Sequence, residues 1–191
     1  MASLRDIFDK NQYDLGQAAK KSKNWFQQQA RLLGRQQVTP QRAMRGGELT
    51  SRPMPGKLYM FLYDPKHKET LPYYDMFPLV FPFSKDSTGF TGLNMHYLPY
   101  QMRVMLLQRL MDFASNKSMD ETTRLKYSWS LIDGVSRYKL AAPCVKRYLA
   151  GHVKTQLKVI PANDWATAML LPVEQFVGAS KQNIWQDSLR G

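Results

Sequence analysis

Three short apolar runs, separated by turn residues, occupy the middle of the chain between Gly56 and Pro99. Residues 58–63 are apolar at every position, which is typical of a strand that is buried on both faces. Residues 76–83 contain Pro78 and Pro82, which lack N–H donors, so we expect an irregular strand at a sheet edge. Residues 90–97 follow a turn cluster at 86–89 and form the third run. The pattern predicts a three-stranded meander that helices or a fourth strand must cover.

Two amphipathic helices are predicted after this meander. Residues 100–113 repeat apolar side chains at helical spacing and follow Pro99, which a helix tolerates at its start. Asp120 is a suitable N-cap for a second helix that ends near Lys139. Each of these helices carries one apolar face, so we expect both to pack into the core.

The sequence pattern of the C-terminal part predicts further short helices and strands. Pro143 suits the first turn of a helix over residues 143–151. Residues 153–160 alternate apolar and polar side chains, which is typical of a strand with one wet, basic face and makes this segment the candidate fourth strand. A short helix holds Trp165, and a last helix begins at Pro172.

The N-terminal part differs from the rest. Residues 3–36 have helical character but only a thin apolar face, and residues 36–55 are rich in Gly, Pro, Thr and Arg, as in an extended linker. We therefore divide the chain into a basic helical arm and linker, residues 1–55, and a core domain, residues 56–191. The predicted fold class is α+β, with an extended N-terminal helical arm, a small antiparallel β-sheet or half-open barrel, and a helical C-terminal half.

Composition limits the class of protein. The chain has 191 residues and 43% hydrophobic content, which is enough for one domain with an appendage. No run approaches the roughly 18 to 20 apolar residues of a membrane span, and the N-terminus lacks the apolar segment of a signal peptide. We therefore expect a soluble protein that is synthesised in a cytoplasm and makes no membrane contact. The one cysteine, Cys144, excludes an internal disulfide.

Charge adds information about partners. The net charge is +12, and residues 1–57 hold 11 Lys or Arg against 4 Asp or Glu. Such a surplus predicts an anionic or acidic partner. Three interpretations of the basic arm stay open: contact with duplex DNA phosphates, docking on an acidic or multi-subunit protein surface, and simple solvation. The candidate partner- or phosphate-binding residues are Lys20, Lys21, Lys23, Trp25, Phe26, Arg31, Arg35, Arg42, Arg45 and Arg52.

Tyr73 and Tyr74 form an aromatic pair after a charged turn. Aromatic side chains with basic neighbours suit stacking on bases or a protein-binding hot spot, and packing against the sheet is the alternative that we favour for one of the two. Motifs for base-specific reading are absent from the sequence, so any DNA contact should be sequence-blind and should weaken steeply with salt.

Signs of enzymatic chemistry are few. The three histidines stand apart at positions 67, 96 and 152, so we expect surface or hydrogen-bonded histidines and no metal. Cys144 fits a buried apolar position better than a catalytic thiol. Asp64, Glu69 and Asp75 are of the types that a metal-dependent nuclease uses, but their spacing matches ordinary turns. We expect a protein without catalytic residues, cofactor or small-molecule substrate.

Five segments of the sequence have a distinctive order of residues, at 54–56, 59–66, 71–83, 92–99 and 143–149, and a sixth at 25–33 is weaker. These segments resemble small virion proteins of T4-like contractile-tailed bacteriophages. The resemblance implies a structural component of the virion, in the tail baseplate or the neck, whose arm reaches over neighbouring subunits. Some members of this group are DNA end protectors.

Two functions follow from the resemblance and the charge together. The main hypothesis is a non-enzymatic component of the baseplate or neck that binds and cements other virion proteins and contacts DNA phosphates. The alternative is a DNA-terminus-binding protector or a nuclease-like head-completion factor. In either case we expect the protein to reside in the virion after synthesis in the host cytoplasm, and its arm to gain order on docking.

Overall fold

The computed structural model describes residues 46–190 except 115 and 117, and the α+β class is confirmed for this part of the chain. The predicted N-terminal helical arm lies almost entirely outside the described residues. The division at residue 55 therefore stays a prediction.

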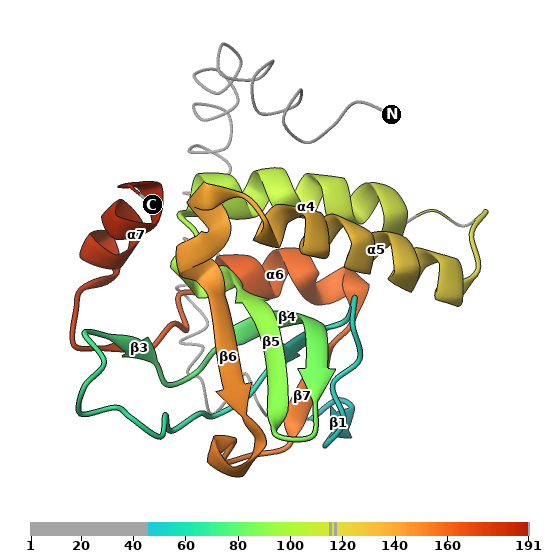
Figure 1. Cartoon of the computed structure of the whole chain (residues 1–191). Helices are drawn as coiled ribbons and strands as arrows, with labels where there is room; N and C mark the ends of the chain where they lie inside the picture. The colour runs from blue at the N-terminus through green and yellow to red at the C-terminus, as the bar shows by residue number, and fades with distance from the viewer. Residues whose placement is uncertain (1–45, 115, 117, 191) are drawn as a thin grey trace.

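A six-stranded antiparallel sheet forms one layer of the molecule, and Figure 1 shows α4, α5 and α6 together on one side of it. The strand order is β1-β7-β2-β4-β5-β6. The predicted meander is confirmed, because β2, β4 and β5 are consecutive antiparallel neighbours. The strands are β1 (Leu49–Thr50), β2 (Leu58–Met60), β4 (Leu79–Asp86), β5 (Gly89–Asn94), β6 (Val145–Leu149) and β7 (Leu157–Ile160).

The predicted edge position of the second run is wrong, because β4 lies between β2 and β5. Two features let an interior strand accept its prolines. Pro78 precedes β4. Within β4, only Leu79 and Val80 pair with β2, so Pro82 lies beyond the β2–β4 ladder. The pairing register between β4 and β5 then shifts between Pro82 and Ser84. The predicted irregularity of this strand is therefore confirmed.

The candidate fourth strand is confirmed in a shorter form. β7 pairs with β2 through Leu58, Tyr59 and Met60, and an isolated bridge joins Tyr63 to Val153. On its other side β7 pairs with β1, which lies within the predicted linker. The sheet therefore extends into residues that composition assigned to the arm.

The predicted helix over residues 143–151 is wrong. A 3-10 helix covers Lys139–Cys144, and the next residues form β6, which pairs with β5 along its full length. The apolar residues of this segment fit a helical face and a strand equally well, and a short run cannot decide between them. The partner strand, more than fifty positions earlier in the sequence, decides.

The helices are largely as predicted. α4 covers Tyr100–Ala114, and α5 covers Glu121–Ser136 with Asp120 as its N-cap, whose Oδ1 accepts the N–H of Thr123 at 2.9 Å. α6 covers Trp165–Leu170, as the short predicted helix required. The last helix begins later than Pro172, because β8 (Phe176–Val177) pairs first with β3 (Tyr74–Asp75), and α7 then covers Lys181–Arg190.

Both faces of the sheet are buried. The helical side packs on a large cluster that includes Leu58, Phe81 and Leu93. The opposite side holds a second, aromatic cluster, in which the Phe61 and Tyr148 rings lie 5.2 Å apart. Residues of β2 alternate between these clusters, which is why its run is apolar at every position.

Candidate nucleic-acid interface

Most of the predicted binding residues lie outside the described part of the chain. Of the basic series, only Arg52 is described; it is exposed and follows β1, where its N–H donates to Thr50 Oγ1 at 3.1 Å. The role of the basic arm therefore stays a prediction.

Tyr73 and Tyr74 are both half-buried. The Tyr73 ring lies 6.1 Å from the Tyr97 ring, and its burial raises the pKa of its phenol above the ordinary value. Tyr74 pairs with Val177 in the small β3–β8 sheet. Tyr73 therefore packs against the protein, as we expected for one of the two tyrosines. A role of Tyr73 or Tyr74 in contacting DNA or another protein stays a prediction.

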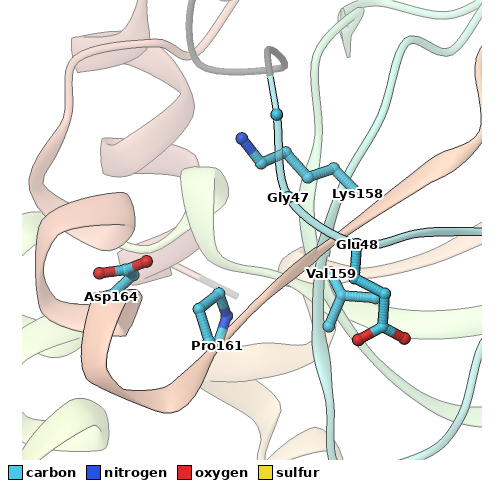
Figure 2. A pocket seen from close by; sticks show the side chains of 7 residues that line it. Gly47, Glu48, Lys158, Val159, Pro161 and Asp164 are labelled. Atoms are coloured by element: carbon cyan, nitrogen blue, oxygen red, sulfur yellow. The ribbon is translucent and has the colours of Figure 1, made fainter.

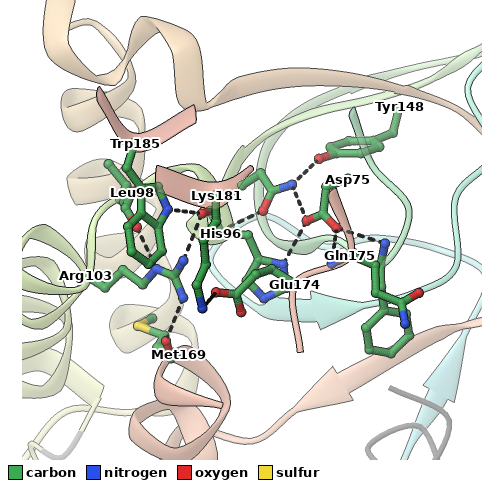
Figure 3. A network of polar contacts seen from close by, with 12 residues as sticks. Asp75, His96, Leu98, Arg103, Tyr148, Met169, Glu174, Gln175, Lys181 and Trp185 are labelled. Atoms are coloured by element: carbon green, nitrogen blue, oxygen red, sulfur yellow. Dashed lines mark hydrogen bonds and ion pairs between the residues drawn. The ribbon is translucent and has the colours of Figure 1, made fainter. Parts of the chain in front are cut away.

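A buried polar network lies where the small sheet meets the large one, and sequence analysis missed it (Figure 3). Asp75 Oδ2 lies 2.8 Å from His96 Nδ1 and accepts the Asn94 amide at 3.1 Å, while Oδ1 accepts the N–H groups of Phe77 and Gln175 at 3.0 and 3.3 Å. Burial opposes ionisation of Asp75 most strongly, but the charge of His96 and these hydrogen bonds outweigh it and lower the carboxyl pKa.

Arg103 forms the second centre of this network. Its guanidinium is fully buried and donates to the carbonyls of Leu98, Met169 and His96 at 2.7, 3.0 and 2.8 Å. The Tyr100 ring lies 4.7 Å from the guanidinium carbon. Burial lowers the pKa of Arg103 from its usual value, and the nearby Glu174 opposes that shift.

The C-terminal segment adds Glu174, Lys181 and Trp185 to the network, in which His96 Nε2 and Glu174 Oε2 have no hydrogen-bond partner among the described residues. Glu174 accepts from Lys181 Nζ at 3.3 Å, and Trp185 Nε1 donates to the carbonyl of His96 at 2.8 Å. Burial favours the neutral form of Glu174, but the interactions with Arg103, His96 and Lys181 outweigh burial and lower its pKa. Glu174 also accepts from Tyr100 Oη of α4 at 3.3 Å, so these contacts fix the C-terminal segment to α4 and to the 3-10 helix Met95–Tyr97.

The network has a structural character. Its carboxylates face cations within the protein, and Asp75, His96 and Arg103 are buried. No spacing signal could have revealed it, because Asp75, His96 and Glu174 come together only when β3 pairs with β8. The expected apolar position of Cys144 is confirmed, since its thiol is buried and burial raises its pKa to about 12.

The acidic residues considered for a nuclease do not converge. Asp64 Oδ1 pairs with Lys68 Nζ at 3.0 Å and its Oδ2 with Lys154 Nζ at 3.8 Å, whereas Asp75 is buried beside His96. Within the described ranges, no three His, Cys, Asp or Glu side chains lie close enough together to hold a metal ion.

One shallow cavity of about 280 Å³ lies beside the start of the described chain (Figure 2). Its lining residues include Glu48, Asp164 and Lys158. Two acidic residues beside one basic residue do not favour a polyanion, so this cavity is a poor site for nucleic acid.

Exposed cations offer a better surface for phosphates. Arg147 is already held by both carboxylate oxygens of Asp86. The hydrogen bonds from Thr88, and after them this contact, keep the pKa of Asp86 well below its usual value. Other exposed cations have no carboxylate of the described residues within ion-pair distance. They are Arg52, Lys66, Lys85, Lys126 and Lys139.

Comparison with known proteins decides the family. A model of the phage T4 terminal DNA protecting protein family matches residues 1–188, which is nearly the whole chain. The chain belongs to this family. No curated protein and no solved structure matches it.

The phage T4 terminal DNA protecting protein family bears on both functional hypotheses. It confirms the resemblance to T4-like phage proteins and agrees with the alternative, a DNA-terminus protector, better than with a baseplate or neck component. The described helices include none that is both long and apolar enough to cross a bilayer.

Proposed function

We propose that this protein binds the ends of linear duplex DNA, without regard to sequence, and protects them from degradation. The observation that carries the proposal is the match of residues 1–188 to the phage T4 terminal DNA protecting protein family. A protector of this kind must hold the last base pairs tightly enough to keep a nuclease from the strand ends.

The charge of the chain supports this proposal. A net charge of +12 attracts DNA, and each phosphate that a lysine or arginine neutralises releases counterions and favours binding. The exposed Lys66, Lys85 and Lys126 have no carboxylate partner in the described part, so they can contact phosphates without breaking an ion pair. Phosphate contacts carry no sequence information, in keeping with a sequence-blind function.

The proposed role is non-enzymatic and belongs to the assembled virion. Protection needs occupancy of the DNA end and no chemical step. The core would hold the DNA end, and the basic arm would add phosphate contacts and reach neighbouring virion proteins. Crosslinking of intact particles through Lys20, Lys21 and Lys23 would identify these neighbours, and partners confined to the baseplate would instead favour the cementing role.

The direct test is digestion of a linear duplex by an exonuclease in the presence of the purified full-length protein. We expect the open-ended duplex to survive many times longer than it does without protein. A restriction endonuclease cutting at an internal site of the same duplex is the control, and its rate should stay nearly unchanged at the same protein concentration. Equal slowing of both enzymes would indicate general coating of DNA and contradict end protection.

The competing nuclease-like function has its own test. Incubation of linear DNA with the protein and Mg²⁺ or Mn²⁺ should leave the strands intact. Cleavage that disappears in Asp64→Ala, or in an Asp75→Ala variant that is still folded at the assay temperature, would contradict the non-enzymatic proposal.

A further inference from the structure

Trp129 is an exposed aromatic side chain held in a fixed orientation. It lies on α5 with 37% of its surface exposed, and its Nε1 donates to the carbonyl of Phe83 on β4 at 3.0 Å. The other two tryptophans of the described part, Trp165 and Trp185, are more buried and donate to carbonyls within the core. An indole that is anchored at its nitrogen and open to solvent is ready to stack on a flat partner at little entropic cost.

The neighbouring exposed aromatic residue on the helix is less available. The Tyr127 ring stacks on Phe113 at 5.3 Å with an interplanar angle of 9°. Tyr127 is two positions from Trp129, so the two side chains point to different sides of α5. Tyr127 therefore serves as a matched control for Trp129.

Cations reach the neighbourhood of Trp129 from three segments. Lys126 lies three positions before it on α5, where side chains are neighbours on the helix surface. Lys85 follows Phe83, the hydrogen-bond partner of the indole, by two positions on β4. Lys57 comes next to Gly56, whose added Cβ would lie 3.4 Å from the Trp129 backbone nitrogen.

Acidic groups near this surface are few or already paired. Lys57 Nζ lies 3.9 Å from Glu121, whose side chain is 74% exposed, so this contact is weak and leaves Lys57 free to turn to another anion. Asp133, one turn after Trp129, is paired with Arg137. We call Lys57, Lys85, Lys126 and Trp129 the Trp129 surface.

We propose that the Trp129 surface covers the terminal base pair of duplex DNA, with the indole stacked on its exposed face and the three lysines contacting phosphates of the last nucleotides. This inference rests on the proposed function. Every internal base pair is stacked on both faces, whereas the last pair leaves one aromatic face in water. Stacking on that face distinguishes an end from the interior and ignores sequence, because every base has a π-face.

The test compares binding of the full-length protein to two duplexes of the same sequence. One duplex has open ends, and the other has both ends closed by hairpin loops, so that it has no exposed terminal pair. We expect the wild type to prefer the open-ended duplex by about tenfold, as loss of one base–aromatic stack would predict. Trp129→Ala should remove this preference and keep the affinity for the closed duplex, which depends on charge. Trp129→Phe should retain most of the preference, and Tyr127→Ala should behave as the wild type.

A second measurement uses the wild type alone and stays valid if Trp129→Ala does not fold. A 5-iodouracil in the terminal pair should crosslink under ultraviolet light to the peptide that contains Trp129, and the same base at an internal position should not. Crosslinks to other peptides only, or an unchanged end preference in a folded Trp129→Ala, would overturn the inference. A wild type that neither prefers nor protects open ends would instead contradict the proposed function itself.

Discussion

Asp75 carries more of the buried network than any other residue. Its two oxygens receive contacts from His96, Asn94, Phe77 and Gln175, and its carboxylate supplies a negative charge beside the imidazole. Removing one partner of a buried pair leaves the other without compensation, which costs about 3–5 kcal/mol in typical cases.

We expect Asp75→Asn to lower the free energy of unfolding at pH 7 by about 3 kcal/mol. The pH dependence follows from the lowered pKa of Asp75 in the folded protein. A depressed carboxyl pKa contributes stability above the unfolded-state pKa of about 4, and this contribution is lost as the pH falls through the folded-state pKa. The difference between wild type and variant should therefore narrow below about pH 4.

Denaturant unfolding of both proteins from pH 7 to pH 3 checks this expectation. Glu69→Gln is a suitable control, because Glu69 is exposed and lies outside the network. If the difference in unfolding free energy between wild type and Asp75→Asn stayed constant over the whole pH range, the substitution would disturb packing and not charge.

Among the secondary-structure elements, β5 depends on a glycine at the point of closest strand approach. A Cβ at Gly92 would lie 2.4 Å from Val80 Cγ1 and 2.8 Å from the carbonyl oxygen of Phe81. The backbone there pairs with Pro82 just before the register shift, so the neighbouring strand has little room to retreat.

Gly92→Ala should therefore destabilise the protein by about 1–3 kcal/mol, the usual cost of overpacking a core. The matched control is Gly151→Ala, because a Cβ at Gly151 meets nothing within 4 Å. Thermal unfolding of the two variants measures the difference. If Gly92→Ala had the same melting temperature as Gly151→Ala, the close contact with Val80 would not constrain β5.

Some secondary-structure elements could be predicted from local sequence signals, and others could not. Local signals were sufficient for α4, for α5 with its Asp120 cap, and for the β2–β4–β5 meander. They failed for β6, whose partner β5 lies far away in the sequence, and for the interior place of β4, where a bulge accommodates Pro82. The buried network was invisible because its residues are joined by tertiary pairing and not by spacing.

For the whole molecule, charge is the property that connects the core with the arm. Residues 1–57 hold 11 of the 27 Lys and Arg residues, and Lys20, Lys21 and Lys23 are among the predicted phosphate contacts. In B-DNA the logarithm of the binding constant falls with the logarithm of salt concentration by about 0.9 for each phosphate neutralised.

We expect Lys20→Gln, Lys21→Gln and Lys23→Gln together to reduce the salt slope of duplex binding by up to about three. Titrations at several salt concentrations measure the slope, and Lys154→Gln, whose lysine already pairs with Asp64, is the control. An unchanged salt slope in the triple variant would indicate that these lysines of the arm contact a protein partner and not DNA.

The place of β7 has a consequence for how the polypeptide is made. β7 supplies the strand between β1 and β2, although it is synthesised about a hundred residues after them, and Trp185 reaches back to His96. A nascent chain still held by the ribosome at residue 150 lacks a sheet neighbour and the indole that closes the core. The sheet must then wait until β7 and Trp185 have left the ribosome, and translation products terminated before them would expose apolar strands and be candidates for aggregation or proteolysis.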